Sequence, residues 1–286
     1  MDRLDTLRIL TAEAERGELT FPTSATVALR VREVLDDPDC ASETAARLIQ
    51  AEPLLAARIV AVANSATFNR SGRVITDVRT AVTLIGFKTV RTLATAMVVR
   101  QMAGMANMAA HRDLAARLWE HTAHVAALAH VIAKEVTRQD PETAMFAGMV
   151  HEIGGFYLLS RAKDFPGLLE GDAKDWAGED KGENAGENAP ESAIGRAVLN
   201  ALSVPQPVVE AIEALWKGYL AFPPATLGDT LQLADQLAPV RSPLFQTPDK
   251  NRNAASIDMI IEEHTLGDIL GESAVEVKSL TEALRF

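Results

Sequence analysis

The sequence predicts an all-α protein, and three observations support that fold class. The chain has 286 residues, of which 48% are hydrophobic and only 5% are aromatic. A core made mostly of Ala, Leu and Val suits closely packed helices better than sheets. Apolar residues recur at helical spacing between clear start and stop signals, and no segment alternates apolar and polar residues long enough to indicate a strand.

The first hundred residues are expected to form short helices separated by turns. Pro22 lies at a helix start in LTFPTSATVALRVREVL, and the turn DDPD follows that segment. Ser42 is an expected N-cap, and Pro53 suits the first position of the next helix. Asp77 is expected to cap the helix in VRTAVTLIG, and Gly86 is expected to end it. The run FKTVRTLATAMVVRQM predicts a further helix.

The second half predicts longer helices. Leu114 to Val136 is a long alanine-rich segment, and Asp140-Pro141 predicts the turn after it. The helix TAMFAGMV runs into HEIGG, and FYLLSRA continues beyond it. Three more helices are predicted in ESAIGRAVLNALSVP, PVVEAIEALW and LGDTLQLADQLA. The tail adds two others, the last of which starts near Ser273.

The chain divides into three predicted regions. Residues 1–105 form an N-terminal helical subdomain, 106–240 a second helical subdomain, and 241–286 a C-terminal helical extension. Within the second, residues 170–190 (EGDAKDWAGEDKGENAGENAP) are acidic and nearly free of large aliphatic side chains. Such a composition predicts a flexible, solvated loop.

Composition and charge restrict the classes of function. The formal net charge is −11, which disfavours a nucleic-acid-binding protein because such proteins need a broad basic surface. The single cysteine, Cys40, excludes an internal disulfide and a multi-cysteine metal site, as expected in a reducing compartment. The N-terminal MDRLDTLRIL lacks the apolar core of a signal peptide, and no run of 18 apolar residues occurs. We therefore expect a soluble cytoplasmic protein without a membrane span.

The stretch AGMVHEIGG contains a doublet, His151-Glu152, with two readings. The two residues could be adjacent metal ligands, or two polar residues at a helix end. In HTAHVAALAH, His121 and His124 share a helix face, whereas His130 lies on the opposite side. Most HxxH pairs have no function, so spacing alone does not decide between the readings.

The combination of these segments is more specific. LWEHTAHVAALAHVIAKEV, AGMVHEIGGFYLL and LQLADQLA together resemble the HD superfamily of metal-dependent phosphohydrolases. The resemblance implies a ligand set of His121, His151, Glu152 and Asp235. Imidazole and carboxylate ligands suit Mn, Fe or Mg, and such an ion lowers the pKa of its bound water to make a nucleophile.

The N-terminal half narrows this resemblance to one branch. FPTSATVALRVREVLDDPDCASETAARLIQAEPLLAARIVAVANSATF and VITDVRTAVTLIGFKTVRTL resemble the HDOD domain, the HD-related output domain of bacterial signalling proteins. The resemblance runs from about Leu19 to about Ala238. It implies a two-part helical bundle, in which the N-terminal subdomain packs on an HD-type bundle. HDOD proteins are generally regarded as regulators without demonstrated enzymatic activity.

The sequence departs from the family patterns at several ligand positions. The doublet is HE and not HD, Leu215 and Trp216 stand where paired histidines are common, and Glu191 replaces another frequent histidine. The motif of cyclic di-GMP phosphodiesterases, HHExxDGxGYP, is also missing. These departures predict a degenerate site. The favoured expectation is that the protein holds no cofactor and catalyses no reaction.

Three hypotheses about function follow. The favoured one is a non-enzymatic signal-transduction module that binds other signalling proteins through its helical surfaces. The second is a divalent-metal phosphohydrolase that acts on a nucleotide-like substrate. The third is a bundle whose vestigial pocket senses a small anionic molecule without turning it over. The oligomeric state stays open.

A basic stretch supplies the candidate partner surface. Residues 70–100 hold six cations against one carboxylate, an excess of five positive charges in an acidic chain. An ordinary solvated face is one reading, and a docking surface for an acidic partner is the other. The predicted partner-binding residues are Arg70, Arg73, Lys88 and Arg91. In ANSATF, we expect Asn64 to satisfy backbone groups at a helix end, helped by its tolerance of the left-handed conformation.

Overall fold

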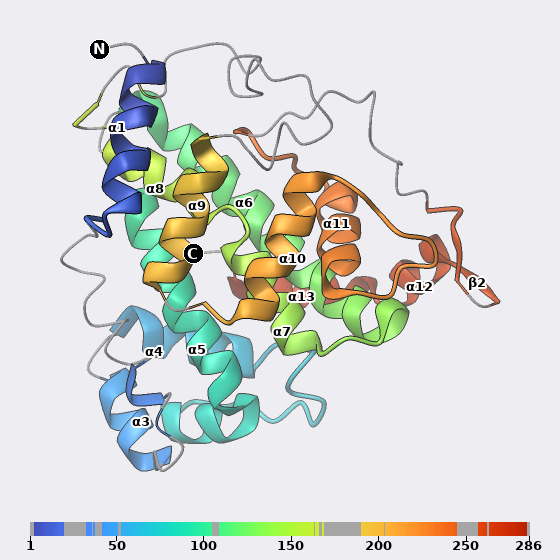
Figure 1. Cartoon of the computed structure of the whole chain (residues 1–286). Coiled ribbons are helices and arrows are strands. Elements are labelled where there is room, and N and C mark those ends of the chain that lie inside the picture. Colours follow the sequence, from blue (N-terminus) through green and yellow to red (C-terminus); the bar gives the residue numbers. More distant parts are fainter. Residues whose placement is uncertain are drawn as a thin grey trace.

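Helices make up most of the described chain in the computed structural model, which confirms the all-α prediction (Figure 1). The structure describes residues 3–19, 33–35, 37, 42–50, 53–104, 109–162, 164–165, 168, 190–202, 204–244, 257–261 and 263–284. The expected helix start at Pro22 and the acidic segment 170–189 lie outside these described residues.

The N-terminal helices begin where local signals place them. Helix α3 spans Ser42–Gln50, α4 spans Pro53–Ala63 and α5 spans Val78–Gly104. The Asp77 carboxylate accepts a hydrogen bond of 2.8 Å from the Thr80 backbone N–H and so caps α5, as predicted. Gly86 has φ 76° and ψ 161°, which are not helical, so it ends the first helical part of α5 at a kink, as predicted. The chain resumes its helix immediately after this glycine.

The central helices cross at very short range. Helix α6 spans Ala109–Ile132 and continues as the π-helix η1, Ala133–Thr137; α7 spans Pro141–Val150 and α8 spans Ile153–Arg161. Asp140 caps α7 by accepting a 2.7 Å hydrogen bond from the Thr143 backbone N–H. Gly148 lets α7 approach α6, because a Cβ atom at this position would lie 2.6 Å from the Cα atom of Ala126.

Three helices predicted beyond the acidic segment are present. Helix α9 spans Pro190–Ala201, α10 spans Gln206–Lys217 and α11 spans Leu227–Leu237. A capping box begins α11: Thr226 accepts from the Asp229 N–H, and the Asp229 carboxylate accepts from the Thr226 N–H. Gly218 follows α10 with φ 70°, a left-handed end that favours glycine.

The C-terminal extension joins both parts of the molecule. It contains a short hairpin, β1 (Ile260–Ile261) and β2 (His264–Thr265), followed by α12 (Leu266–Glu272) and α13 (Ala274–Leu284). Helix α13 packs against both α4 and α6. Arg58 of α4 donates a 3.1 Å hydrogen bond to the Ala283 carbonyl, and Lys134 of η1 lies 3.3 Å from Glu276.

The other end of the chain also crosses the molecule. Helix α1 (Arg3–Glu15) packs against α9, as Figure 1 shows, and Arg161 of α8 donates a 3.0 Å hydrogen bond to Glu13. Helix α5 contacts α3 and α4 as well as α7 and α8. The region boundaries at 105 and 240 stay predictions.

One helix among the described residues has the length and apolar composition to cross a membrane. This segment, Val78–Val99, has 67% of its most apolar window buried inside the protein. Buried core helices commonly pass the same test, so the segment is weak evidence for a membrane span. A cytoplasmic location stays a prediction.

Candidate functional site

Four predicted ligands come from four places in the chain. His121 lies in the middle of α6, His151 follows α7, Glu152 precedes α8, and Asp235 lies in the last turn of α11. The structure brings the ligand atoms of His121, His151 and Asp235 within 4.8 Å of one another. Within the described part of the chain, no other group of three such residues is close enough to hold an ion.

Backbone carbonyls fix the orientation of both imidazole rings. The Nδ1–H of His121 donates to the Val240 carbonyl, and the Nδ1–H of His151 donates to the Gly148 carbonyl, each at 2.7 Å. A carbonyl can only accept, so each neutral ring carries its lone pair on Nε2. The two Nε2 atoms lie 3.1 Å apart. Ligand histidines in metal sites are commonly held in this way through their second nitrogen.

Two carboxylates lie beside this histidine pair. Asp235 Oδ1 is 3.3 Å from His121 Nε2, and Glu152 Oε1 is 4.0 Å from the same atom. The other oxygen of Glu152, Oε2, is buried without a hydrogen-bond partner. An orphaned buried carboxylate oxygen is costly, and a cation would satisfy it. The donor set therefore fits one divalent ion, held by His121, His151 and Asp235 with Glu152 adjacent.

Burial dominates the electrostatics of the site. It lowers the pKa of His151 to about 4 and raises the pKa of Glu152 to about 7. Burial also opposes protonation of His121, but the hydrogen bond with Asp235 and the charge of Glu152 raise its pKa above the usual value. His151 is therefore neutral at pH 7, the form in which imidazole binds a metal.

The family model of the HDOD domain matches residues 21–217. This chain belongs to the HDOD family. No curated protein matches it. The resemblance that pointed to this family from the sequence is thereby confirmed.

Solved structures share the HDOD fold along the whole chain. A protein from Shewanella amazonensis SB2B, provisionally described as a metal-dependent phosphohydrolase, is 22% identical with a TM-score of 0.70, over 99% of each chain. An HDOD domain protein of unknown function from Geobacter sulfurreducens is 21% identical with a TM-score of 0.64, over 98% of this chain and 99% of the other. At such low identity the likeness concerns the fold.

A third structure shares the fold over part of its own length. A protein from Marinobacter aquaeolei VT8, provisionally described as a signal transduction protein, is 17% identical with a TM-score of 0.52. The alignment covers 93% of this chain and 57% of that one. These neighbours therefore share the fold of this HDOD chain.

The HDOD site of this chain is nearly closed to solvent. His121, His151 and Glu152 are 1%, 5% and 4% exposed, and the side chain of Asp235 is 13% exposed. The Trp216 ring packs against α9: it lies 3.1 Å from where a Cβ of Gly195 would stand, and the Arg196 guanidinium lies over it. The side chain of Glu191 lies outside what the structure describes.

Sequence reasoning missed the segment that closes this site. Residues 240–242 follow α11, where the Val240 carbonyl orients His121 and the Ser242 hydroxyl donates a hydrogen bond to Glu152. The Gly148 carbonyl has the same role for His151. Backbone carbonyls leave no residue-type signal, so no sequence pattern indicates these contacts.

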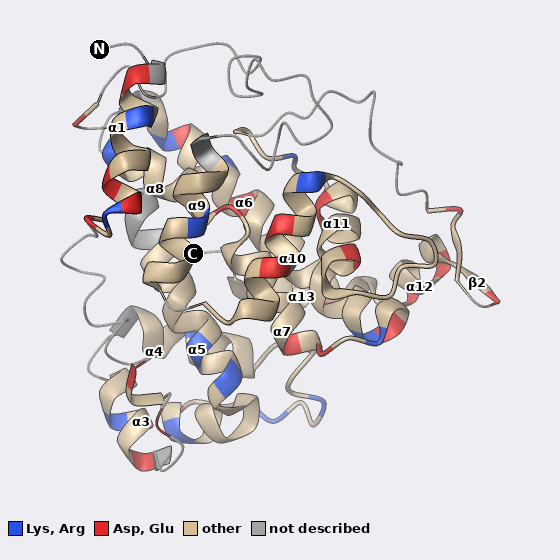
Figure 2. Ribbon diagram, in the orientation of Figure 1, with Lys and Arg blue, Asp and Glu red and all other residues tan. Residues whose placement is uncertain are grey.

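The four predicted partner-binding residues of this HDOD chain differ in their surroundings. Lys88 forms an ion pair with Asp140, and Arg91 donates a 3.0 Å hydrogen bond to the Leu35 carbonyl. Arg70 and Arg73 are exposed in the loop between α4 and α5, where Figure 2 shows basic residues in blue. Partner binding by any of the four stays a prediction.

Asn64 has a structural role in the same loop. Its side chain donates to the carbonyls of Val60 (2.9 Å) and Ile75 (2.7 Å) and accepts from the Ile75 N–H (2.8 Å). The expected satisfaction of backbone groups is therefore present. The expected left-handed conformation was wrong, because Arg138 is the only described non-glycine residue with a positive φ.

Proposed function

We propose that this HDOD protein is a non-enzymatic regulatory module that acts by binding other signalling proteins. The observation that carries the proposal is the closure of the candidate site. Three of its four polar side chains are at most 5% exposed, so a bound ion there would have little room for a substrate. Phosphoryl chemistry with two metals would need more ligands than this cluster supplies. The single cysteine favours a reducing, cytoplasmic setting, and the HDOD resemblance favours a bacterial one.

A single divalent ion would then have a structural role. His121, His151 and Asp235 would hold it, and Glu152 would balance its charge. When bound, such an ion supplies Lewis acidity and lowers the pKa of a bound water. The residues themselves orient the ring nitrogens and exclude solvent, which stabilises the junction of α6, α7 and α11.

The proposed partner surface is the loop Asn69–Ile75. Arg70, Arg73 and Val74 are exposed on it, with Val74 80% exposed. The Asn69 side chain donates a 2.7 Å hydrogen bond to the Arg73 carbonyl, and the Asn64 side chain donates one to the Ile75 carbonyl. A loop fixed in this way loses little entropy on binding. Two cations and an apolar tip suit an acidic partner surface with an apolar pocket.

The test compares partner capture by three forms of the protein. The forms are wild type, Arg70→Glu/Arg73→Glu and His121→Ala/His151→Ala, each used as bait in a lysate of the source organism. Captured proteins are identified by mass spectrometry and then confirmed as purified partners by titration. Charge reversal should lower affinity at least tenfold, about 1.4 kcal/mol, and weaken its salt dependence. Partners lost only with the histidine variant would place function at the buried site and contradict the proposal.

Lys88→Glu/Arg91→Glu is the matched control for the loop. It reverses the same number of charges, but Lys88 and Arg91 contact Asp140 and Leu35 within the protein. We expect it to lower stability and to leave partner affinity within about threefold. A larger loss of affinity with this control than with the loop variant would move the partner surface to α5.

The second candidate function is a metal-dependent phosphohydrolase. The convergence of two histidines and Asp235 favours it. The test is turnover of cyclic di-GMP and of a chromogenic phosphodiester with Mn, Fe or Mg. We expect no turnover above the rate of His151→Ala. Steady turnover that His151→Ala abolishes would establish the enzyme and overturn the non-enzymatic proposal.

A further inference from the structure

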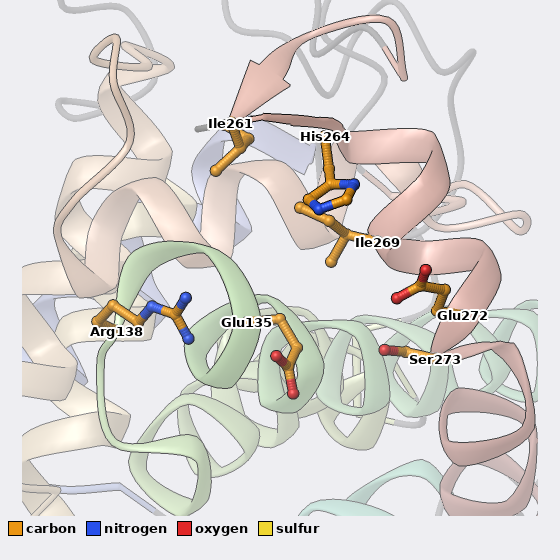
Figure 3. Close-up of a pocket in the computed structure, with 7 residues that line it drawn as sticks. All are labelled: Glu135, Arg138, Ile261, His264, Ile269, Glu272 and Ser273. Atoms are coloured by element: carbon orange, nitrogen blue, oxygen red, sulfur yellow. The ribbon is translucent and has the colours of Figure 1, made fainter.

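A cavity of about 250 Å³ lies between the end of the long helix α6 and the C-terminal extension (Figure 3). Glu135 and Arg138 reach it from η1 and the residue after it, and Glu272 reaches it from α12. Ile261 and Ile269 supply apolar walls from β1 and α12. This cavity is separate from the His121 cluster, and the function proposed above does not use it.

Arg138 is held in an unusual backbone conformation at the cavity. It follows the π-helix with φ 55° and ψ 32°, a left-handed geometry that costs a non-glycine residue about 1 kcal/mol or more. Its Nη1 donates a 3.0 Å hydrogen bond to the Lys134 carbonyl. The ion pairs of the described residues do not include Arg138, so the positive charge at the cavity is not neutralised by a neighbour.

Two carboxylates face the same space. Glu135 lies 2.9 Å from Lys134, whose ammonium is shared with Glu276 at 3.3 Å. Glu272 is exposed and has no ion pair within the described part of the chain. The cavity therefore presents an unneutralised guanidinium and an unneutralised carboxylate, with a second carboxylate only partly neutralised.

This arrangement of charges selects among ligand classes. A phosphate or other anion would meet the two carboxylates, and a simple cation would meet Arg138. The carboxylates are not close enough to each other and to His264 to form an ion site, because the described residues hold only the His121 cluster as such a group. A molecule with one carboxylate and one ammonium matches both charges at once.

We propose that this cavity binds a free α-amino acid with an aliphatic side chain. Its carboxylate would pair with Arg138, its ammonium with Glu272 and Glu135, and its side chain would lie on Ile261 and Ile269. The volume suits this class, since 250 Å³ holds roughly eight waters at ~30 Å³ each, and so a ligand of about eight non-hydrogen atoms. The site would give the module a small-molecule input.

The cavity is also connected to the central helices. Thr137 of η1 forms a 2.6 Å hydrogen bond between hydroxyl groups with Thr230 of α11, the helix that carries Asp235. Occupation of the cavity would restrain η1 and, through this contact, α11.

The test is calorimetric titration of the full chain with L-leucine, L-isoleucine, L-valine and L-methionine, at up to about 10 mM ligand. Two analogues separate the charges: 4-methylpentanoate has only the carboxylate, and 3-methylbutylamine has only the ammonium. We expect at least one amino acid to bind, and each analogue to bind at least tenfold more weakly. Failure of all four amino acids, or equal affinity for 4-methylpentanoate, overturns the proposal.

Substitutions at the cavity test whether the amino acid binds there. Arg138→Gln should weaken amino-acid binding at least tenfold and leave amine binding unchanged, whereas Glu272→Gln should weaken the amino acid and the amine alike. Arg8→Gln removes an exposed cation on α1 and is the matched control. Melting temperatures show that each variant is folded, and Arg138→Lys should retain part of the affinity. Binding that is unchanged in both cavity variants contradicts the site.

Discussion

The Nε2 atoms of His121 and His151 lie 3.1 Å apart, and each ring is held in place through its Nδ1 by a backbone carbonyl. Two neutral rings in these tautomers face each other with lone pairs. Such a pair is stable only if something positive lies between or beside the two nitrogens, either a proton or a metal ion. With Asp235 at 3.3 Å, the pair is suited to a cation.

We expect Mn²⁺ or Fe²⁺ to stabilise the folded protein, because binding to the folded state alone shifts the unfolding equilibrium. At a metal concentration of 100 Kd the gain is about 2.7 kcal/mol, measured as a rise in melting temperature after removal of chelator. His151→Ala should abolish the rise. His111→Ala changes a histidine outside the cluster and should retain it. An equal rise in both variants would show binding elsewhere.

Glu152→Gln should stabilise the metal-free protein at pH 8 more than at pH 5. Burial raises the pKa of Glu152 from 4.5 to about 7, so the folded state keeps a proton that the unfolded state has lost. Folding stability from this group is therefore lost as pH rises from about 4.5 to about 7. The gain at pH 8 is on the order of 3 kcal/mol at most, measured by urea unfolding with chelator present.

The exposed carboxyl of Glu263 provides the control for this pH effect. Glu263→Gln should change the free energy of unfolding by the same small amount at both pH values. His151 has a lowered pKa and gives a slope of the opposite sign, but it is present in both proteins and cancels in the comparison. A Glu152→Gln effect independent of pH would indicate packing and not charge.

Gly148→Ala should destabilise the protein by about 1–3 kcal/mol or more, because the new Cβ would lie 2.6 Å from the Ala126 Cα. The helices α6 and α7 must separate, and the Gly148 carbonyl that orients His151 moves with them. Metal affinity should fall as well. Gly271→Ala lies in α12 with open space at its Cβ, and it should be neutral or stabilising by up to ~1 kcal/mol. Equal effects of the two substitutions would contradict the close contact.

Asp140→Ala should cost more stability than Lys88→Met. The ion pair between Lys88 and Asp140 is about half exposed, so its loss costs at most ~1 kcal/mol. Asp140 also caps α7 through Thr143, and loss of the cap adds about 0.5–2 kcal/mol. Urea unfolding of both variants and of the double variant separates the two contributions. A greater loss from Lys88→Met would mean that Lys88 has contacts beyond Asp140.

Local signals in the sequence predicted several helix starts: α3 begins at Ser42 and α4 at Pro53, and Asp77 caps α5 through the backbone of its near neighbour Thr80. Gly86 was expected to end a helix, and its non-helical φ of 76° and ψ of 161° separate the two helical parts of α5 at a kink. The hairpin near Ile260 was missed because two-residue strands leave no alternation to detect.

The candidate site could be assembled from the sequence only through family resemblance. Spacing along one helix places residues on a face, but it does not say that α6 and α11 meet at His121 and Asp235. The contacts that orient the site come from carbonyls at Gly148 and Val240, which every residue type possesses. Long-range packing and the choice of backbone acceptors are therefore the features of the site that could not be predicted from a single sequence.

The contacts of the first and last helices limit how segments of this protein can be exchanged with those of a relative. Helix α1 belongs by sequence to the first part but packs on α9, and α13 spans α4 and α6. A chimera that exchanges residues before 105 for those of a relative would replace one side of each of these contacts and leave the other. We therefore expect a chimera to keep its stability only when the whole span from α1 to α13 comes from one protein.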